Sequence, residues 1–252
     1  KVMAPKIIDE QSFDAREQEL IDAAIELIQQ LGSENLTIDK LVAVVPFSKG
    51  TVYKHFTSKE DLLLAVSNKA LGILSDLFIR ASQFQGCTRE RMLLVSFAYL
   101  IYALLHPALF ETMLCSKSPT IFGKSSEDRI KQQQALEIRL LGAIHGIVQE
   151  GIELSHLVLP DYMDIQQVCF AHWSKGYGTI SLLSGEAPPC EASSALILEQ
   201  ELFNQNNLMF DGLQWAPLTK DKDYRIALKE AMSSVFQEEL ASLKKLGREL
   251  NF

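Results

Sequence analysis

Apolar residues recur at intervals of three and four along most of the chain, and this spacing predicts amphipathic helices. The first apolar face is followed by Gly32, and glycine is the residue that commonly follows the last turn of a helix. We therefore expect a helix over about residues 14–31. Its buried face consists of Leu20, Ile21, Ala24, Leu27, Ile28 and Leu31.

Two short helices are expected next. Thr37 can accept a backbone N–H as the N-cap of a helix over residues 38–45. Pro46 ends that helix, because a proline ring cannot continue the helical turn. Ser48 is the N-cap of the second short helix, so the two are joined by a turn of about three residues.

The second short helix runs for about two turns, with Val52 and Phe56 four residues apart on its inward face. Ser58 then caps a longer helix, and two acidic residues in its first turn lie where the helix dipole favours negative charge. An apolar stripe continues this helix towards Ala81. Two short helices flanked by longer ones therefore precede the rest of the chain.

The remainder also has helical spacing and shows no strand pattern. Residues 88–106 are apolar almost all round, as a central helix would be. We expect about ten helices in all and an all-α fold. The further helices are expected at 107–115, through the stripe 140–148 to about Gly151, and at 161–183, 195–213 and 224–250, with a loop at 184–194.

Composition agrees with a globular protein, because 47% of the 252 residues are hydrophobic and 22% are charged. The longest nearly apolar run, residues 93–105, is shorter than the roughly 20 residues that span a bilayer. The first residues show no apolar block followed by a small-residue cleavage site. We therefore expect a cytoplasmic protein that does not bind membranes.

Neither metal nor disulfide chemistry is indicated. The four cysteines, at 87, 115, 169 and 190, form no Cys-x-x-Cys pair and no spaced framework. Glu153 and His156 form a single Glu-x-x-His, whereas a di-metal site in a helix bundle needs two copies and further glutamates. We expect no metal, no cofactor and no catalytic residue.

Charge is unevenly distributed. The formal net charge of the chain is -8, yet the charged residues between positions 40 and 59 are all lysines. A basic segment can bind a polyanion, although a solvated lysine face is the more common explanation of such a short run. The arrangement of the two short helices and their turn favours polyanion binding over a solvated lysine face. It is that of a helix-turn-helix, in which the second helix enters the DNA major groove.

The segment Leu36 to Val66 resembles the DNA-binding region of the tetracycline-repressor (TetR) family. It departs from the family in the turn, where Val45, Pro46 and Phe47 replace a usual Ala-Gly-Val, so the turn must take a backbone route without positive φ. The residues that carry the resemblance are Ser48, Gly50, Thr51, Tyr53, His55, Phe56, Lys59 and Leu62.

The resemblance implies roles for single residues. Lys49, Gly50 and Thr51 lie where the family reads base edges in the major groove. Residues in the other matching positions are expected to hold the sugar-phosphate backbone, either at helix N-termini or through side chains. These are Thr37, Ser48, Tyr53, Lys54, His55 and Lys59.

The resemblance also implies two domains: a helix-turn-helix domain over residues 1–66, and a larger helical domain over 67–252 that dimerises and holds a ligand. The net charge after position 70 is negative, which suits a domain that faces away from DNA. Few formal charges lie between residues 92 and 114, so we expect an apolar or amphipathic ligand. The candidate pocket residues are Phe78, Phe97, Tyr99, Tyr102, Phe110 and Met113.

The expected function is that of a ligand-responsive repressor which binds a pseudo-palindromic operator as a homodimer and is released by a small molecule. Three alternatives stay open at this point. The protein could activate transcription, or it could sense oxidants through Cys87 or Cys115. The large domain could also be a helical enzyme, although its sequence shows no catalytic pair of a nucleophile and a base.

Overall fold

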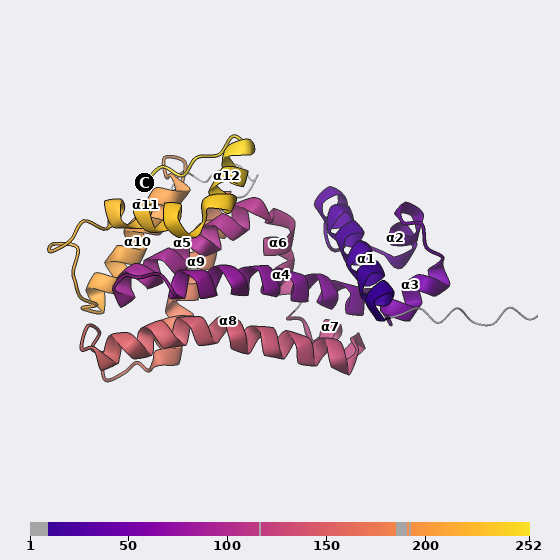
Figure 1. The fold of residues 1–252 in the computed structure, drawn as a ribbon, viewed down its shortest axis with the longest axis horizontal. Coiled ribbons are helices and arrows are strands. Elements are labelled where there is room, and N and C mark those ends of the chain that lie inside the picture. The colour runs from indigo at the N-terminus through magenta and orange to yellow at the C-terminus, as the bar shows by residue number, and fades with distance from the viewer. Residues whose placement is uncertain (1–9, 116, 185–190, 192) are drawn as a thin grey trace, which may run out of the picture. The chain divides into compact units, whose positions relative to one another are not determined.

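The computed structural model describes residues 10–115, 117–184, 191 and 193–252. These residues form twelve α-helices and no strand, which confirms the all-helical prediction (Figure 1). The helices are α1 Glu10–Leu31, α2 Ile38–Val44, α3 Lys49–His55, α4 Lys59–Ser82, α5 Thr88–Leu105, α6 Pro107–Cys115, α7 Pro119–Lys124, α8 Glu127–Glu153, α9 Ile165–Ser184, α10 Leu198–Gly212, α11 Tyr224–Val235 and α12 Gln237–Lys245.

The chain divides into two compact units. The first comprises residues 1–71 and 107–135, and the second comprises 72–106 and 136–252. The first unit therefore contains α6, α7 and the start of α8 in addition to the helix-turn-helix. The division into domains at residues 66 and 67 stays a prediction, and that position falls within α4.

In the first unit, α1 packs against α2 and α6, and α2 packs against α3. Gly32 ends α1 with a φ of +81°, a left-handed conformation that glycine adopts without strain. The predicted inward face of α1 is buried except for Leu31, which is 39% exposed. The core of this unit thus holds the short helices in place through apolar contacts.

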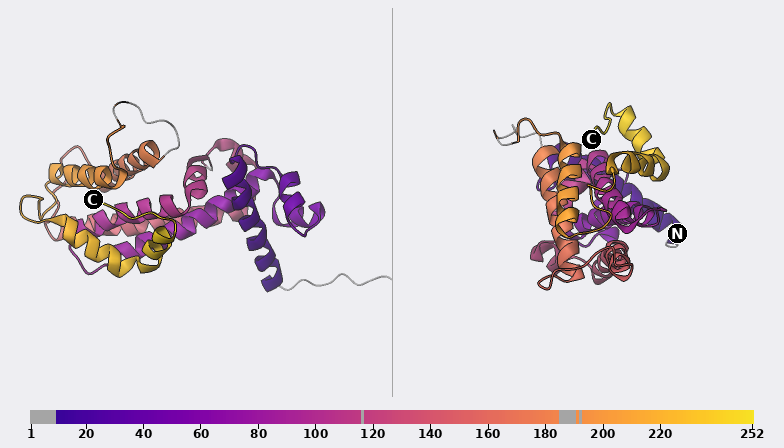
Figure 2. Two further views of the ribbon diagram at one scale, coloured as in Figure 1. Left: turned by 90° about the horizontal axis from the view of Figure 1, so that it is seen from above. Right: turned by 90° about the vertical axis from the view of Figure 1, so that its left-hand side faces the viewer.

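In the second unit, α5 is the central helix, as predicted, because it contacts α9, α10, α11 and α12. Most of its residues are buried, which explains why its sequence is apolar almost all round. Helices α9 and α10 pack side by side, and Figure 2 shows them as neighbouring orange helices.

Helix α4 is long and apolar enough, by length and composition, to cross a bilayer. However, 72% of its most apolar window is buried inside the protein. A core helix of a globular protein has this combination of features, because its apolar side chains face other helices.

Several helix boundaries differ from the sequence prediction. Helix α8 ends at Glu153, two residues after the predicted end near Gly151, so Gly151 itself lies inside the helix. A Cβ there would come within 3.3 Å of both Thr88 Oγ1 and Trp215 Nε1, so close packing explains this glycine. The expected last helix breaks at Phe236, whose ring is fully buried beneath the Arg80 guanidinium. Helix α7 was not predicted. The predicted loop at 184–194 lies mostly outside the described residues.

A buried arginine organises the second unit. Arg89 is fully buried on α5 and donates hydrogen bonds to Asp211 Oδ1 (2.7 Å), to Asn207 Oδ1 (2.9 Å) and to the carbonyl oxygens of Trp215 (2.8 Å) and Pro217 (2.9 Å). The guanidinium carbon of Arg89 also lies 4.6 Å from the ring centroid of Tyr224. The planar guanidinium presents several N–H donors in a rigid geometry that suits this set of acceptors. Arg89 therefore holds the segment between α10 and α11 in place.

Candidate nucleic-acid interface

The N-termini of α2 and α3 are capped by the residues that the sequence indicates. Thr37 accepts a hydrogen bond from the backbone N–H of Lys40 (3.1 Å). Ser48 accepts one from the backbone N–H of Thr51 (3.2 Å), and the two hydroxyl oxygens lie 3.0 Å apart. Both caps are exposed, so the ends of the two helices face solvent.

The turn between α2 and α3 uses no positive φ angle, as expected for a proline at its centre. Val45 is extended, with φ −114° and ψ 153°, the conformation that a following proline favours. For this reason α2 ends at Val44, one residue earlier than predicted. Phe47 contacts α1, where the guanidinium of Arg16 lies 5.3 Å from its ring centroid.

Helix α3 has an inward and an outward face. Val52 on α3 and Phe56 just after it are fully buried, as predicted, and fix the orientation of the helix. Tyr53 is 47% exposed, and Lys54 is exposed as well. The outward face is completed at its N-terminal end by Lys49, Gly50 and the half-buried Thr51.

His55 does not belong to the outward face. Its side chain is 1% exposed, its ring stacks on Phe13 with centroids 3.9 Å apart, and Nδ1 lies 3.4 Å from Glu17 Oε2. Burial lowers the pKa of the imidazole, and this outweighs the opposing effect of the Glu17 carboxylate. A neutral interior side chain cannot hold a phosphate, so we place His55 in the packing of α3 against α1.

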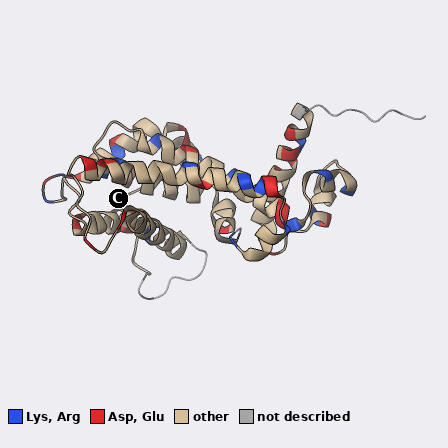
Figure 3. Cartoon of the chain, turned by 90° about the horizontal axis from the view of Figure 1, so that it is seen from below, with Lys and Arg blue, Asp and Glu red and all other residues tan. Residues whose placement is uncertain are grey.

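Two of the expected DNA-contact lysines have partners within the first unit. Lys49 Nζ lies 2.6 Å from Asp39 Oδ1, and this carboxylate raises the pKa of Lys49. Lys59 Nζ donates to the Glu34 carbonyl oxygen at 2.8 Å. Figure 3 colours the ribbon blue at lysine and arginine positions and red at aspartate and glutamate positions. Between positions 40 and 59 the basic residues are the only charged ones, and α3 bears two of them.

This arrangement suits the major groove of DNA. A helix about 10–12 Å wide fits that groove, and the exposed ammonium and hydroxyl groups of α3 can donate to phosphates and base edges. The fold and this surface define the class of the protein: an all-helical chain that contains a helix-turn-helix unit.

The sequence of the same segment matches a known family. Residues 20–66 match the family described as bacterial regulatory proteins, tetR family. This range includes α2, α3 and the first part of α4. The helix-turn-helix segment of this chain is therefore similar to the DNA-binding region of that family.

Sequence comparison matches parts of the chain to known regulators. An uncharacterized HTH-type transcriptional regulator of Mycobacterium tuberculosis is 36% identical over 63 residues, which are 25% of this chain and 31% of that protein. The fatty acid metabolism regulator protein of Bacillus subtilis is 25% identical over 136 residues, which are 54% of this chain and 67% of that protein. This chain thus spans about a third of the length of the mycobacterial regulators that it matches.

Solved structures extend the likeness to most of the chain. The TetR family transcriptional regulator PfmR of Thermus thermophilus matches with a TM-score of 0.56 and 24% identity, over 77% of this chain and 98% of that one. The transcriptional regulator FadR of Bacillus subtilis in complex with stearoyl-CoA matches with a TM-score of 0.57 and 16% identity, over 80% of this chain and 98% of that one. At these identities the likeness shows a shared fold.

The six candidate pocket residues are all buried, but they do not form one group. Phe78, Tyr99 and Tyr102 form a row of ring contacts in the second unit, with centroids 6.1 Å and 6.4 Å apart. Phe97 packs instead against Phe252, with centroids 4.6 Å apart. The other two candidates, Phe110 and Met113, lie in the first unit.

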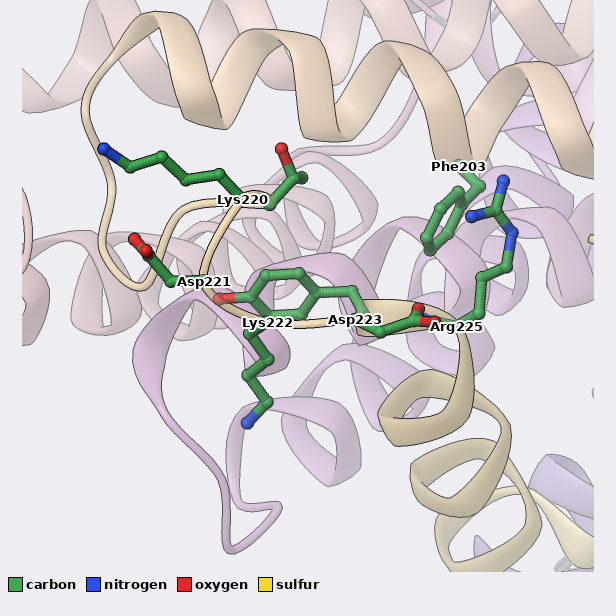
Figure 4. Close-up of a pocket in the computed structure, with 8 residues that line it drawn as sticks. Phe203, Lys220, Asp221, Lys222, Asp223 and Arg225 are labelled. Atoms are coloured by element: carbon green, nitrogen blue, oxygen red, sulfur yellow. The ribbon is translucent and has the colours of Figure 1, made fainter.

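A cavity of about 410 Å³ lies elsewhere in the second unit, and none of the six candidates lines it. It is bordered by Phe203 and by residues 219–225 at the start of α11 (Figure 4). The guanidinium of Arg225 lies 4.8 Å from the Phe203 ring centroid. Basic and acidic residues alternate along this rim, and sequence spacing alone did not indicate the cavity.

A buried polar cluster in the second unit was also missed from the sequence. Ser96 Oγ on α5 lies 2.6 Å from His172 Nε2 on α9 and 3.0 Å from Asn206 Oδ1 on α10. Lys175 Nζ donates to the same Asn206 oxygen at 2.6 Å. Burial lowers the pKa of His172 to about 3 and that of Lys175 to about 7. The cluster joins residues far apart in sequence, so no local motif reveals it.

Proposed function

We propose that this protein is a transcriptional repressor that binds a pseudo-palindromic operator as a homodimer, with α3 of each copy in successive major grooves. The observation that carries the proposal is the exposed surface of α3, in a segment that matches the tetR family. A two-fold dimer reads a palindrome because each copy presents the same helix to its half-site. Such a protein works in the cytoplasm, where it meets its DNA.

The contacts divide into two kinds in this proposal. Lys49, Gly50 and Thr51 read base edges, and Tyr53 and Lys54 hold the backbone from the same exposed face. Lys59 and the two cap residues, Thr37 and Ser48, contribute further backbone contacts. His55 is left out because its side chain is buried.

The effector in this proposal is an amphipathic molecule with an acyl chain. One relative is named a fatty acid metabolism regulator, and a protein of the same fold has been solved with stearoyl-CoA. The buried tyrosine and phenylalanine rings of the second unit are compatible with an apolar chain. By binding more tightly to the form that does not fit the operator, such an effector would release the DNA.

Selection of duplexes from a random-sequence pool tests the DNA-binding part. We expect the protein to enrich a palindrome and to bind it with an affinity that falls steeply with salt. Equal binding of the selected duplex and a scrambled one at every salt concentration would contradict the proposal. Transcription in vitro from a promoter containing the palindrome then separates repression from activation.

Titration of the protein–duplex complex tests the effector class. Stearoyl-CoA should release the DNA, whereas free coenzyme A, which lacks the acyl chain, should not. Release by both compounds would show that the acyl chain is not what is recognised.

The redox alternative receives less support. Burial raises the pKa of the Cys87 thiol, so little of the reactive thiolate is present at neutral pH. The side chain of Cys115 lies outside the described residues.

A further inference from the structure

An arginine in the first turn of α8 connects three helices of the first unit. The side chain of Arg129 is 11% exposed. Its NH1 lies 2.7 Å from Glu17 Oε1 on α1, and its NH2 donates to the carbonyl oxygen of His55, the last residue of α3, at 3.3 Å. Its Nε lies 3.7 Å from Asp61 Oδ1 on α4. One guanidinium thus contacts α1, α3 and α4.

A further contact strengthens this arrangement. The guanidinium carbon of Arg129 lies 5.3 Å from the ring centroid of Phe56, the C-cap of α3. A cation over an aromatic face is attracted to it, and more so when water is excluded. Both the carbonyl and the ring at the end of α3 are therefore held by the same side chain.

The acidic partners are held in fixed positions. Glu17 presents its second oxygen to His55 Nδ1. Asp61 is 1% exposed and accepts hydrogen bonds from the backbone N–H groups of Thr57 (3.0 Å) and Ser126 (3.1 Å). Loss of Arg129 would leave these carboxylates without their guanidinium, and a buried charge without its partner is strongly unfavourable.

Helix α8 is itself attached at this point. The carbonyl oxygen of Arg129 accepts a hydrogen bond from Asn68 Nδ2 on α4, at 3.0 Å. The helix begins at Glu127 in the first unit and runs on to Glu153, past residue 135 where that unit ends along the chain.

We propose that Arg129 is a positioning residue that holds the recognition helix α3 between α1 and α4, and that displacement of the first turn of α8 frees α3 and weakens operator binding. This inference rests on the proposed function. Arg129 is distinct from the expected DNA-contact residues, because it is mostly buried and its partners are protein groups.

The test uses the full chain and two duplexes: a palindrome selected by the wild-type protein from a random-sequence pool, and a scrambled duplex of the same length. Arg129→Gln removes the positive charge and the planar set of guanidinium donors. Arg139→Gln is the matched control, because Arg139 lies on the same helix and pairs with Asp76 at 2.7 Å, but both side chains are at least half exposed. Glu17→Gln is a milder second variant, which keeps an acceptor for His55.

We expect Arg129→Gln to bind the palindrome about tenfold more weakly, within the usual range of coupling between sites, at a temperature where circular dichroism shows wild-type helicity. Binding to the scrambled duplex should weaken less, because phosphate contacts that carry no sequence information depend less on a fixed orientation of α3 than base contacts do. Arg139→Gln should behave as wild type. Arg129→Lys should restore affinity only in part, because an ammonium group cannot reproduce that planar set of donors.

Amide hydrogen exchange provides the second readout. Exchange in α3 should be faster in Arg129→Gln, and to a smaller extent in Glu17→Gln, and unchanged in Arg139→Gln. Unchanged palindrome affinity together with unchanged exchange in α3 would overturn the proposal, as would an equal loss on both duplexes. If the wild-type protein prefers no duplex, the proposed function fails, and exchange in α3 alone then decides the role of Arg129.

Discussion

Lys49 on the expected base-reading helix forms an ion pair with Asp39, whose Oδ1 lies 2.6 Å from the lysine Nζ. Asp39 belongs to the first turn of α2, so the supporting helix supplies a negative charge to the surface of α3. Both side chains are well exposed, at 54% and 76%. DNA must compete with this carboxylate for the ammonium group, and the carboxylate also repels phosphates.

Asp39→Asn should therefore increase affinity for every duplex. Removal of one negative charge frees Lys49 for a phosphate or base, so the slope of binding against salt should become steeper by up to about one unit. Fluorescence anisotropy at several salt concentrations measures both quantities. Asp76→Asn, which breaks an exposed aspartate–arginine pair in the second unit, is the control and should leave both unchanged.

Lys49→Ala and Lys59→Ala should have different kinds of effect on DNA binding. A residue that reads bases carries sequence information, so Lys49→Ala should alter which palindrome is enriched in a selection experiment. Lys59→Ala should weaken binding to all sequences alike and reduce the salt slope by about one. Equal effects of both variants on every sequence would contradict this division of roles.

Arg89→Met should destabilise the second unit by about 3–5 kcal/mol, because it leaves a desolvated acceptor set around Asp211 and Asn207. Urea unfolding followed by tryptophan fluorescence reports on this unit, since both tryptophans, Trp173 and Trp215, lie in it. The exposed pair removed by Arg139→Gln should cost less than about 1 kcal/mol. Similar losses in the two variants would show that the buried network is weak.

The buried histidine predicts a pH dependence. The pKa of His172 is about 3 in the folded protein, against an ordinary value of 6.5. Between these values the unfolded chain binds the proton and the folded chain does not, so the free energy of unfolding should fall as pH decreases, by at most about 1.4 kcal/mol per pH unit. Lys175, whose pKa is lowered to about 7, contributes in the same direction between pH 10.5 and 7.

Urea titrations from pH 7 to 4 measure this effect. His172→Gln should flatten the curve over that range, because the glutamine does not titrate. His145→Gln is the matched control, since His145 is exposed on α8, and it should keep the wild-type slope. A wild-type slope in His172→Gln would assign the pH dependence to other groups.

Two tyrosines provide a matched pair of hydroxyl deletions. The hydroxyl of Tyr102 is buried and has no hydrogen-bond partner among the described residues, whereas that of Tyr224 donates to the Pro217 carbonyl oxygen at 2.6 Å. Tyr102→Phe should therefore raise the free energy of unfolding by about 1 kcal/mol, and Tyr224→Phe should lower it by about the same amount. Thermal unfolding compares them. If Tyr102 is a handle for the effector, its variant should also lose response to stearoyl-CoA.

Much of the DNA-binding segment could be predicted from local sequence. Thr37 and Ser48 act as N-caps because their hydroxyls lie within reach of a backbone N–H three residues on. Pro46 ends α2 through its ring and through its effect on Val45. These effects act over one turn of helix, so the sequence of that turn contains their cause.

Features that depend on packing were predicted less well. His55 fits a surface role by its position in the motif, yet it is enclosed by Phe13 and Glu17 from α1. Gly151 looks like a helix end, and Phe236 looks like part of a continuous helix. In each case a contact with a distant segment decides the outcome, and a local pattern does not contain that contact.

By itself, the sequence determined that this protein is built of helices, where most of them begin and end, and that a helix-turn-helix of the TetR type lies near its start. Only the tertiary structure decided which polar groups are buried together. Arg129 with Glu17 and Asp61, and Ser96 with His172 and Asn206, come from segments separated by many residues. Capping and amphipathic spacing are short-range effects, whereas a buried ion pair or hydrogen bond forms only when folding brings its partners together and excludes water.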